Sequence, residues 1–247
     1  MNIDKAMLKR TVGELVAEDY RTAEVFKKNG IDFCCGGKKT IAEVCQQKGL
    51  DADLLQTALE RLDELPAAGA RQLDFQSWPL PFLADYIVNV HHRYVLEKVP
   101  QIMQYASKVA KVHGHAYTET VAIAEKFELL AEELILHLKK EEHILFPYVK
   151  FLQEAKDKDL AIQEPPFGSV QNPIQMMEEE HEFAGDTMRE IRQLSNDFTP
   201  PESACNTYRV LYKLLEEFEA DLHQHVHLEN NILFPQAQEL EAALLRG

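Results

Sequence analysis

The chain has 247 residues, of which 45% are hydrophobic, which is enough for a core in one large domain or two unequal ones. Its formal net charge of −15 argues against nonspecific binding to nucleic acid or to an anionic membrane. The N-terminus lacks the apolar segment of a signal peptide, and no apolar run approaches the length that spans a bilayer. Four cysteines, two of them vicinal, do not form the pattern of a secreted disulfide framework. The sequence therefore predicts a soluble cytoplasmic protein with no nucleic-acid or membrane partner.

Residues 1–66 are predicted to form a small helical N-terminal domain. Thr-x-x-Glu capping boxes at Thr11 and Thr40 indicate two helix starts. The turn Asp-Phe-Cys-Cys-Gly-Gly-Lys-Lys lies between them, and residues 66–72 have the small, polar composition of a linker.

Cys34 and Cys35 in this turn are candidates for thiol or iron chemistry. Adjacent cysteines form a strained disulfide only rarely, so a chelate or a reactive thiol is as good an interpretation as a bridge. Lys38 and Lys39 supply positive charge, which favours a thiolate. A small, buried, apolar cysteine is the alternative, and the residues alone leave the choice open.

The remainder, residues 78–247, is predicted to be a bundle of long helices, because helix signals run throughout and strand alternation is hard to find. A capping box at Thr199 indicates the start of the last helix. Pro147 and Pro235 are expected to kink or loosen the second and fourth helices. The predicted helices cover residues 79–112, 117–156, 173–195 and 200–243.

Two segments of these helices nearly repeat each other. HLKKEEHILFP begins at His137 and HVHLENNILFP begins at His225, an offset of 88 residues (225 − 137). Each pairs a histidine with a glutamate four residues later. A helix turns about 100° per residue, so the two side chains lie about 40° apart and reach the same volume. Imidazole nitrogen and carboxylate oxygen together suit iron, manganese or zinc, and the repeat predicts a binuclear metal site.

A lone histidine precedes each copy at a similar distance, 45 residues (137 − 92) in the first half and 44 (225 − 181) in the second. One His-x-x-x-Glu on an acidic helix is usually a solvated pair, but duplication on two apolar faces favours a metal site. Four helices would then supply four histidines and two bridging carboxylates. The predicted ligands are His92, His137, Glu141, His181, His225 and Glu229.

Helical periodicity separates these residues from other histidines. Only one of His91 and His92 is expected to face inward, and we choose His92 because valines at −4, +3 and +7 form an apolar stripe with it. His143 and His227 should face solvent or a neighbouring helix. Three more have no repeat partner and are expected at the surface or in loops, namely His113, His115 and His223.

Two further carboxylates are candidates for a catalytic or transport role. Glu133 lies one turn before His137, and Glu180 immediately precedes His181. Either could relay protons or guide iron that leaves the site. The alternative is that both belong to a solvated acidic helix face.

Together, the Cys-Cys-Gly-Gly turn and the duplicated His-x-x-x-Glu with Ile-Leu-Phe-Pro resemble the iron–sulfur cluster repair di-iron proteins, the YtfE/ScdA or repair of iron centres family. The resemblance covers essentially the whole chain. It implies an all-α protein, with a ScdA-type domain over residues 1–66 and a hemerythrin-like four-helix bundle over residues 78–247. It also implies two iron ions per chain with an oxo or hydroxo bridge, the four histidines being terminal ligands and Glu141 and Glu229 bridging.

The resemblance implies repair of iron–sulfur clusters damaged by nitrosative or oxidative stress, by iron donation or by nitric oxide handling. The implied partners are damaged iron–sulfur proteins and nitric oxide or oxygen, and a homodimer stays open. The alternatives are a nitric oxide reductase and a sensor or carrier of nitric oxide or oxygen, so classification as an enzyme is open. Oxygen-carrying hemerythrins use five histidines, one more than this set. A ferritin-like site would need a duplicated Glu-x-x-His, and Glu178 to His181 has no duplicate.

Overall fold

The computed structural model describes residues 6–64 and 73–246, and these residues form helices with no strand. By its internal contacts the chain divides into two compact units, one of Met1–Pro79 with Val226–Gln236 and the other of Leu80–His225 with Ala237–Gly247. The predicted all-α class is confirmed, whereas the domain limits 1–66 and 78–247 stay a prediction. No helix in the described ranges is long and apolar enough to cross a membrane.

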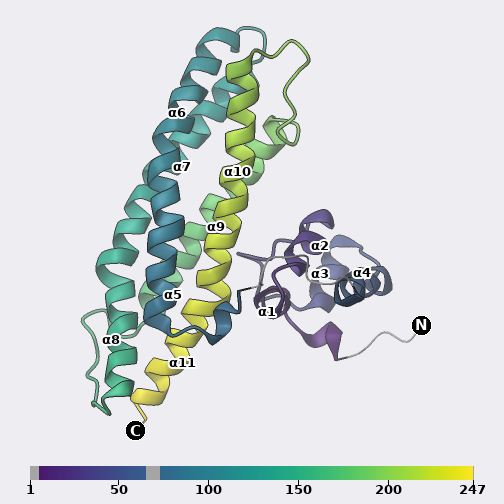
Figure 1. Ribbon diagram of the computed structural model, residues 1–247. Coiled ribbons are helices and arrows are strands. Elements are labelled where there is room, and N and C mark those ends of the chain that lie inside the picture. The colour runs from purple at the N-terminus through teal and green to yellow at the C-terminus, as the bar shows by residue number, and fades with distance from the viewer. Residues whose placement is uncertain (1–5, 65–72, 247) are drawn as a thin grey trace. The chain divides into compact units, whose positions relative to one another are not determined.

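Short helices make up the N-terminal part of the first unit (Figure 1). Both predicted capping boxes are confirmed: the Glu14 backbone N–H donates to Thr11 Oγ1 at 3.2 Å, and the Glu43 backbone N–H donates to Thr40 Oγ1 at 3.3 Å. The predicted linker at 66–72 lies outside the described residues. The helices are η1 (Met7–Lys9), α1 (Val12–Glu18), α2 (Thr22–Lys28), α3 (Ile41–Lys48), α4 (Ala52–Glu64) and η2 (Phe75–Ser77).

Glycine is required in the Cys-Cys-Gly-Gly turn because Asn231, in the same unit, approaches the backbone closely. The Asn231 side-chain amide donates to the Phe33 carbonyl oxygen at 3.0 Å. A Cβ atom at Gly37 would lie 2.3 Å from Asn231 Oδ1 and 2.8 Å from the Phe33 carbonyl oxygen. The second glycine of the turn therefore serves close packing.

Long helical runs form the bundle (Figure 1). Helix α7 packs against α6 and α9, and large apolar side chains such as Phe127 and Phe218 fill the interior, with ring centroids 5.3 Å apart. The runs are α5 (Leu80–Ile87), η3 (Val88–His92) and α6 (Arg93–His113); α7 (Glu119–Lys140), η4 (Glu141–Leu145) and α8 (Phe146–Asp157); α9 (Gln171–Leu194); and α10 (Asn206–Leu228), η5 (Glu229–Leu233) and α11 (Phe234–Leu244).

Three of the four predicted long helices agree with these runs within two residues, but the predicted start of the fourth is wrong. Helix α10 begins at Asn206, not at residue 200. Pro201 follows Pro200 directly, and a residue before proline is disfavoured in helical conformation. The preceding residues 196–198 all have left-handed backbone, with φ between 50° and 54°. The chain therefore turns sharply and stays irregular before it enters the helix.

Each of the short segments η3, η4 and η5 is π-helical, and each contains one predicted ligand. The segments are Val88–His92, Glu141–Leu145 and Glu229–Leu233. Two of them end just before Phe-Pro, in agreement with the expected loosening, since Pro147 and Pro235 lack the N–H that would continue the regular hydrogen-bond ladder. A π turn adds a residue to the helix and turns the side chains around it, and such turns often occur at functional sites.

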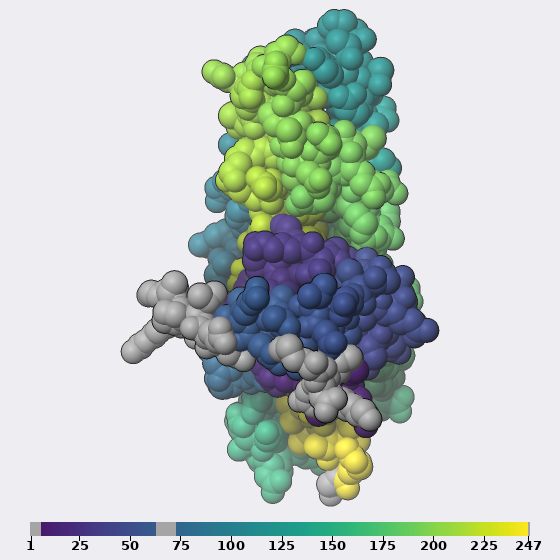
Figure 2. Space-filling view, turned by 90° about the vertical axis from the view of Figure 1, so that its right-hand side faces the viewer, coloured from purple at the N-terminus to yellow at the C-terminus, as the bar shows by residue number. Residues whose placement is uncertain are grey.

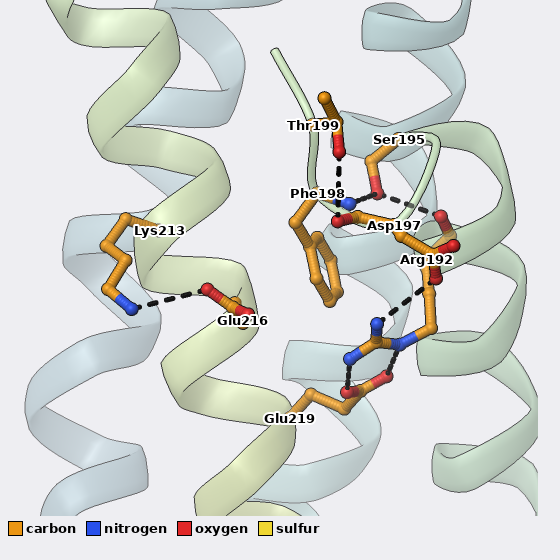
Figure 3. Close-up of polar contacts among 8 residues, drawn as sticks. All are labelled: Arg192, Ser195, Asp197, Phe198, Thr199, Lys213, Glu216 and Glu219. Carbon is orange, nitrogen blue, oxygen red and sulfur yellow. Dashed lines mark hydrogen bonds and ion pairs between the residues drawn. The ribbon is translucent and has the colours of Figure 1, made fainter. Parts of the chain in front are cut away.

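A charged pair joins α9 to α10 (Figure 3). Arg192 Nε donates to Glu219 Oε1 at 2.8 Å, and a second guanidinium nitrogen pairs with Oε2. The Glu219 side chain is only 3% exposed. The same guanidinium lies 4.6 Å over the Phe198 ring and contacts Asp197 at 3.2 Å, so it also holds the left-handed turn.

Replacing Arg192 by methionine is expected to lower the free energy of unfolding by about 3 kcal/mol, because Glu219 would keep its buried charge without a cation. The control is Lys213→Met, which breaks an ion pair with Glu216 whose side chains are 65% and 48% exposed (Figure 3). That change should cost less than about 1 kcal/mol. Denaturant unfolding of the two variants tests the difference, and equal losses would contradict the structural role of the buried pair.

Candidate metal centre

Two groups of histidine and glutamate side chains meet in the bundle. Within each group the potential ligand atoms lie within 4.8 Å of one another, and every member is buried. Both groups contain the same two carboxylates, so all six residues predicted from the repeat lie close to one another. The first group is His92, Glu141, His225 and Glu229, and the second is His137, Glu141, His181 and Glu229.

Glu141 lies between histidines from two helices. Its Oε2 atom is 3.3 Å from His92 Nε2 and 3.3 Å from His137 Nε2. His137 Nε2 is in turn 3.0 Å from His181 Nε2. Glu141 and Glu229 are both 0% exposed. Burying two carboxylates in one small volume is costly unless a cation compensates them, and the nitrogen and oxygen donors suit a first-row transition metal. The residues therefore fit a metal ion in each group.

Two other glutamates fix the orientation of the histidines. His92 Nδ1 donates to Glu142 Oε1 at 2.8 Å, and His137 Nδ1 donates to Glu180 Oε2 at 2.8 Å. Because a carboxylate only accepts, these bonds place the proton on Nδ1 and leave Nε2 to face the centre. The sequence reasoning missed Glu142, since its repeat counterpart at +88 is an asparagine and the repeat gave no signal.

Glu180 is held in its ionised form. Burial raises its pKa, but hydrogen bonds and charge from His137 and Lys140 outweigh burial and leave the pKa below its ordinary value. Lys140 Nζ also forms an ion pair with this carboxylate. An anionic partner increases the basicity of the His137 ring, which strengthens the ring as a metal ligand.

A cavity of about 370 Å³ lies beside His137, between α7 and α9. Its wall is mostly apolar and includes Leu130, Leu134 and Phe183. The two carboxylates singled out in the sequence, Glu133 and Glu180, also line it. Glu133 is exposed, whereas the Glu180 side chain is 26% exposed. The cavity gives a route from solvent to one edge of the centre.

The expectation that only one of His91 and His92 faces inward is wrong, because both are buried, at 2% and 1% exposure. The π-helical turn of η3 departs from the 100° rotation per residue that a regular helix would impose. His92 belongs to the first ligand group, and His91 belongs to neither. His143 is exposed, as expected. His227 is buried beside Tyr20 and Phe33 of its own unit, and burial lowers its pKa to about 4.

Cys34 and Cys35 in the first unit form no disulfide, and their Sγ atoms lie 3.9 Å apart. The expectation that the lysines favour a thiolate fails at Cys34. A hydrogen bond with Cys35, burial, and the charges of Cys35 and Asp32 raise the pKa of Cys34 well above its ordinary value. The Cys34 thiol donates to Asp32 Oδ1 at 3.3 Å, and these three side chains form a further group of possible metal ligands.

Known proteins are similar in sequence to this chain over most of its length. The profile of the hemerythrin HHE cation binding domain matches residues 83–237, which include all six predicted ligands, and that of ScdA_N, a domain of unknown function (DUF542), matches residues 8–63. Proteins named iron–sulfur cluster repair protein YtfE, from Yersinia pestis (strain Pestoides F) and Yersinia pseudotuberculosis serotype O:1b, are 36% identical to it over 228 residues, 92% of this chain and 96% of each relative. The chain belongs to the YtfE family. The predicted hemerythrin-like bundle and small helical N-terminal domain are thereby confirmed.

Proposed function

We propose that this YtfE-family protein repairs iron–sulfur clusters damaged by nitrosative or oxidative stress, through a di-iron centre built on the six buried side chains. The single observation that supports this most is that the two ligand groups share Glu141 and Glu229 in a chain 36% identical to iron–sulfur cluster repair proteins. Two shared carboxylates suit a pair of ions with an oxo or hydroxo bridge. The proposed partners are damaged iron–sulfur proteins in the cytoplasm, where the thiols of Cys34, Cys35, Cys45 and Cys205 would stay reduced.

When bound, the two irons would supply redox chemistry and exchangeable coordination positions for small ligands. The residues of the chain do the rest. Glu142 and Glu180 hold the rings of His92 and His137 in the tautomer that presents Nε2. The apolar cavity wall admits small uncharged molecules such as nitric oxide or oxygen. Glu133 and Glu180, which line the same cavity, give a departing ferrous ion two carboxylates on its way to a client protein.

Reactivation of a cluster enzyme that nitric oxide has damaged tests the proposal. Iron-loaded wild-type protein is expected to restore activity anaerobically, and Glu141→Ala is not, because it lacks a carboxylate common to both groups. His143→Ala is the matched control on an exposed neighbour of the same helical run, and it should repair like wild type. Full repair by the metal-free Glu141→Ala protein would contradict a role of the centre.

Nitric oxide reduction is a second candidate function, favoured by the apolar cavity that ends at His137. Reduced, iron-loaded protein given nitric oxide and an excess of a chemical reductant, without oxygen, decides between the two. Release of nitrous oxide over many turnovers would support an enzyme. Binding of nitric oxide without nitrous oxide release, with full reversal on its removal, would instead support a sensor or carrier. If the protein neither releases nitrous oxide nor binds nitric oxide reversibly, but transfers iron, iron donation to damaged clusters would remain as the function.

Replacing Glu180 by alanine is expected to raise the dissociation constant for iron about 10- to 100-fold, because His137 would lose the carboxylate that orients its ring. Glu179→Ala is the control, since Glu179 is an exposed neighbour that also lines the cavity. Competition with a ferrous chelator of known affinity measures both variants. Wild-type affinity in Glu180→Ala would contradict the positioning role.

A further inference from the structure

The two halves of the repeat place different side chains beside the ligand histidines His137 and His225. The lone histidines His92 and His181 are 89 residues apart (181 − 92). Glu180 immediately precedes His181, and its counterpart 89 residues before it in the chain is His91 (180 − 89). Likewise, Glu133 lies one turn before His137, and the residue 88 positions later is Asp221 (133 + 88). The repeat therefore places His91 and Asp221 beside His225 as Glu180 and Glu133 are placed beside His137.

Beside His225 these counterparts form a closed contact. His91 Nδ1 donates to Asp221 Oδ1 at 3.0 Å, which joins η3 to α10. The His91 ring lies parallel to the His225 ring, at an interplanar angle of 10° and a centroid separation of 5.5 Å. Tyr86 also packs against the His91 ring, with the ring centroids 5.8 Å apart. His91 is 2% exposed and Asp221 18% exposed, whereas Glu133 beside the open cavity is exposed.

The pair is not explained by stability alone. Among the residues that the structure describes, His91 Nε2 and Asp221 Oδ2 are buried without a hydrogen-bond partner. Buried polar atoms of this kind cost free energy, and an apolar side chain of similar size would pack at the same place without that cost. The π turn that brings His92 into the centre also brings His91 inward. The His91 ring therefore occupies the position that corresponds to Glu180 in the other half, where Glu180 lines the cavity beside His137.

We propose that the His91–Asp221 pair closes the His225 side of the metal centre, so that small ligands and iron exchange through the cavity beside His137. This inference rests on the proposed di-iron centre. It assigns to His91 a positioning role: the ring blocks a second opening that the repeat would otherwise create. On this proposal, the two ligand sets of the bundle differ in access, with the His137 side open and the His225 side closed.

Transfer of ferrous iron from loaded protein to a water-soluble ferrous chelator tests the inference. His91→Ala is expected to keep two irons per chain and to lose them at least about tenfold faster than wild type. His91→Phe refills the space with a ring that cannot bond to Asp221, and it should transfer iron at the wild-type rate. Transfer by His91→Ala at the wild-type rate would overturn the closure role. So would transfer by His91→Phe that is as fast as the accelerated transfer by His91→Ala.

A second measurement needs no iron. Crystals of metal-free protein under xenon pressure should bind the gas beside His137 in wild type, and beside both His137 and His225 in His91→Ala. No xenon beside His225 in His91→Ala would overturn the inference even where alanine weakens iron binding. A wild-type protein that binds no iron would instead contradict the proposed function, so the two failures are distinguishable.

Discussion

Replacing Glu141 by alanine is expected to abolish binding of both irons, whereas His181→Ala should remove or weaken only one. The reason is that the Glu141 carboxylate belongs to both ligand groups, while His181 belongs to one. Glu229→Ala is expected to match Glu141→Ala for the same reason. Iron per chain after anaerobic reconstitution and desalting measures the difference.

The control for these variants is Glu132→Ala, an exposed glutamate on the helix that carries His137. It should bind the same iron as wild type, which excludes a general effect of losing one acidic side chain. Loss of a single ion in Glu141→Ala, with the second ion retained at full affinity, would show that the carboxylate is not shared. That result would contradict a bridging role of Glu141.

Removal of iron is expected to destabilise the protein by about 4 kcal/mol or more for each ion, if free iron is held about a thousandfold above its dissociation constant.

The metal-free bundle keeps Glu141 and Glu229 buried in one volume, where two negative charges repel. Glu141→Gln removes one of these charges with little change of shape. It should therefore be less stable than wild type when iron is present, and more stable, by about 1–3 kcal/mol, when iron is absent.

Denaturant unfolding under anaerobic conditions, with and without a strong chelator, measures this change of sign. Glu132→Gln serves as the control, since its exposed side chain should leave stability within about 0.5 kcal/mol of wild type in both states. A Glu141→Gln protein that is less stable in both states would mean that the carboxylate is structural, and that its burial is not compensated by metal.

The ligand set was readable from the sequence because duplication repeated its spacing. His137 with Glu141 and His225 with Glu229 follow one helical rule, and the lone histidines recur at nearly the same distance before them. Once four helices were predicted, these six side chains had one common interior to face. The structure gathers all six, and their role as ligands stays a proposal.

What the sequence did not reveal depends on local departures from regular helix. A uniform 100° per residue predicts that His91 turns away from His92, and the π turn of η3 makes that rule fail. The start of α10 at Asn206 follows from two successive prolines after a left-handed turn, which outweigh the capping box at Thr199.

Surroundings that come from distant segments were equally hard to predict. The raised pKa of Cys34 reflects Cys35, burial and Asp32, whereas the sequence drew attention to the lysines that follow. The cavity beside His137 depends on how α7 and α9 pack, and no residue pattern marks its size. Of the acidic residues that line it, the sequence singled out Glu133 and Glu180 as candidates, with a solvated helix face as the alternative.

The two halves of the bundle also show how a duplicated unit can become asymmetric. The buried ligands repeat, while their neighbours differ: carboxylates line a cavity on one side, and a histidine–aspartate pair fills the other. The space-filling view shows one face of the molecule, with α10 in yellow-green and α9 in green (Figure 2).

Anomalous X-ray diffraction at the iron absorption edge, from crystals of reconstituted protein, would locate the proposed irons of the di-iron centre. We expect two peaks per chain, one beside His92 and His225 and the other beside His137 and His181, with Glu141 and Glu229 between them. A single peak, or iron bound at Cys34 and Cys35 with none in the bundle, would contradict it.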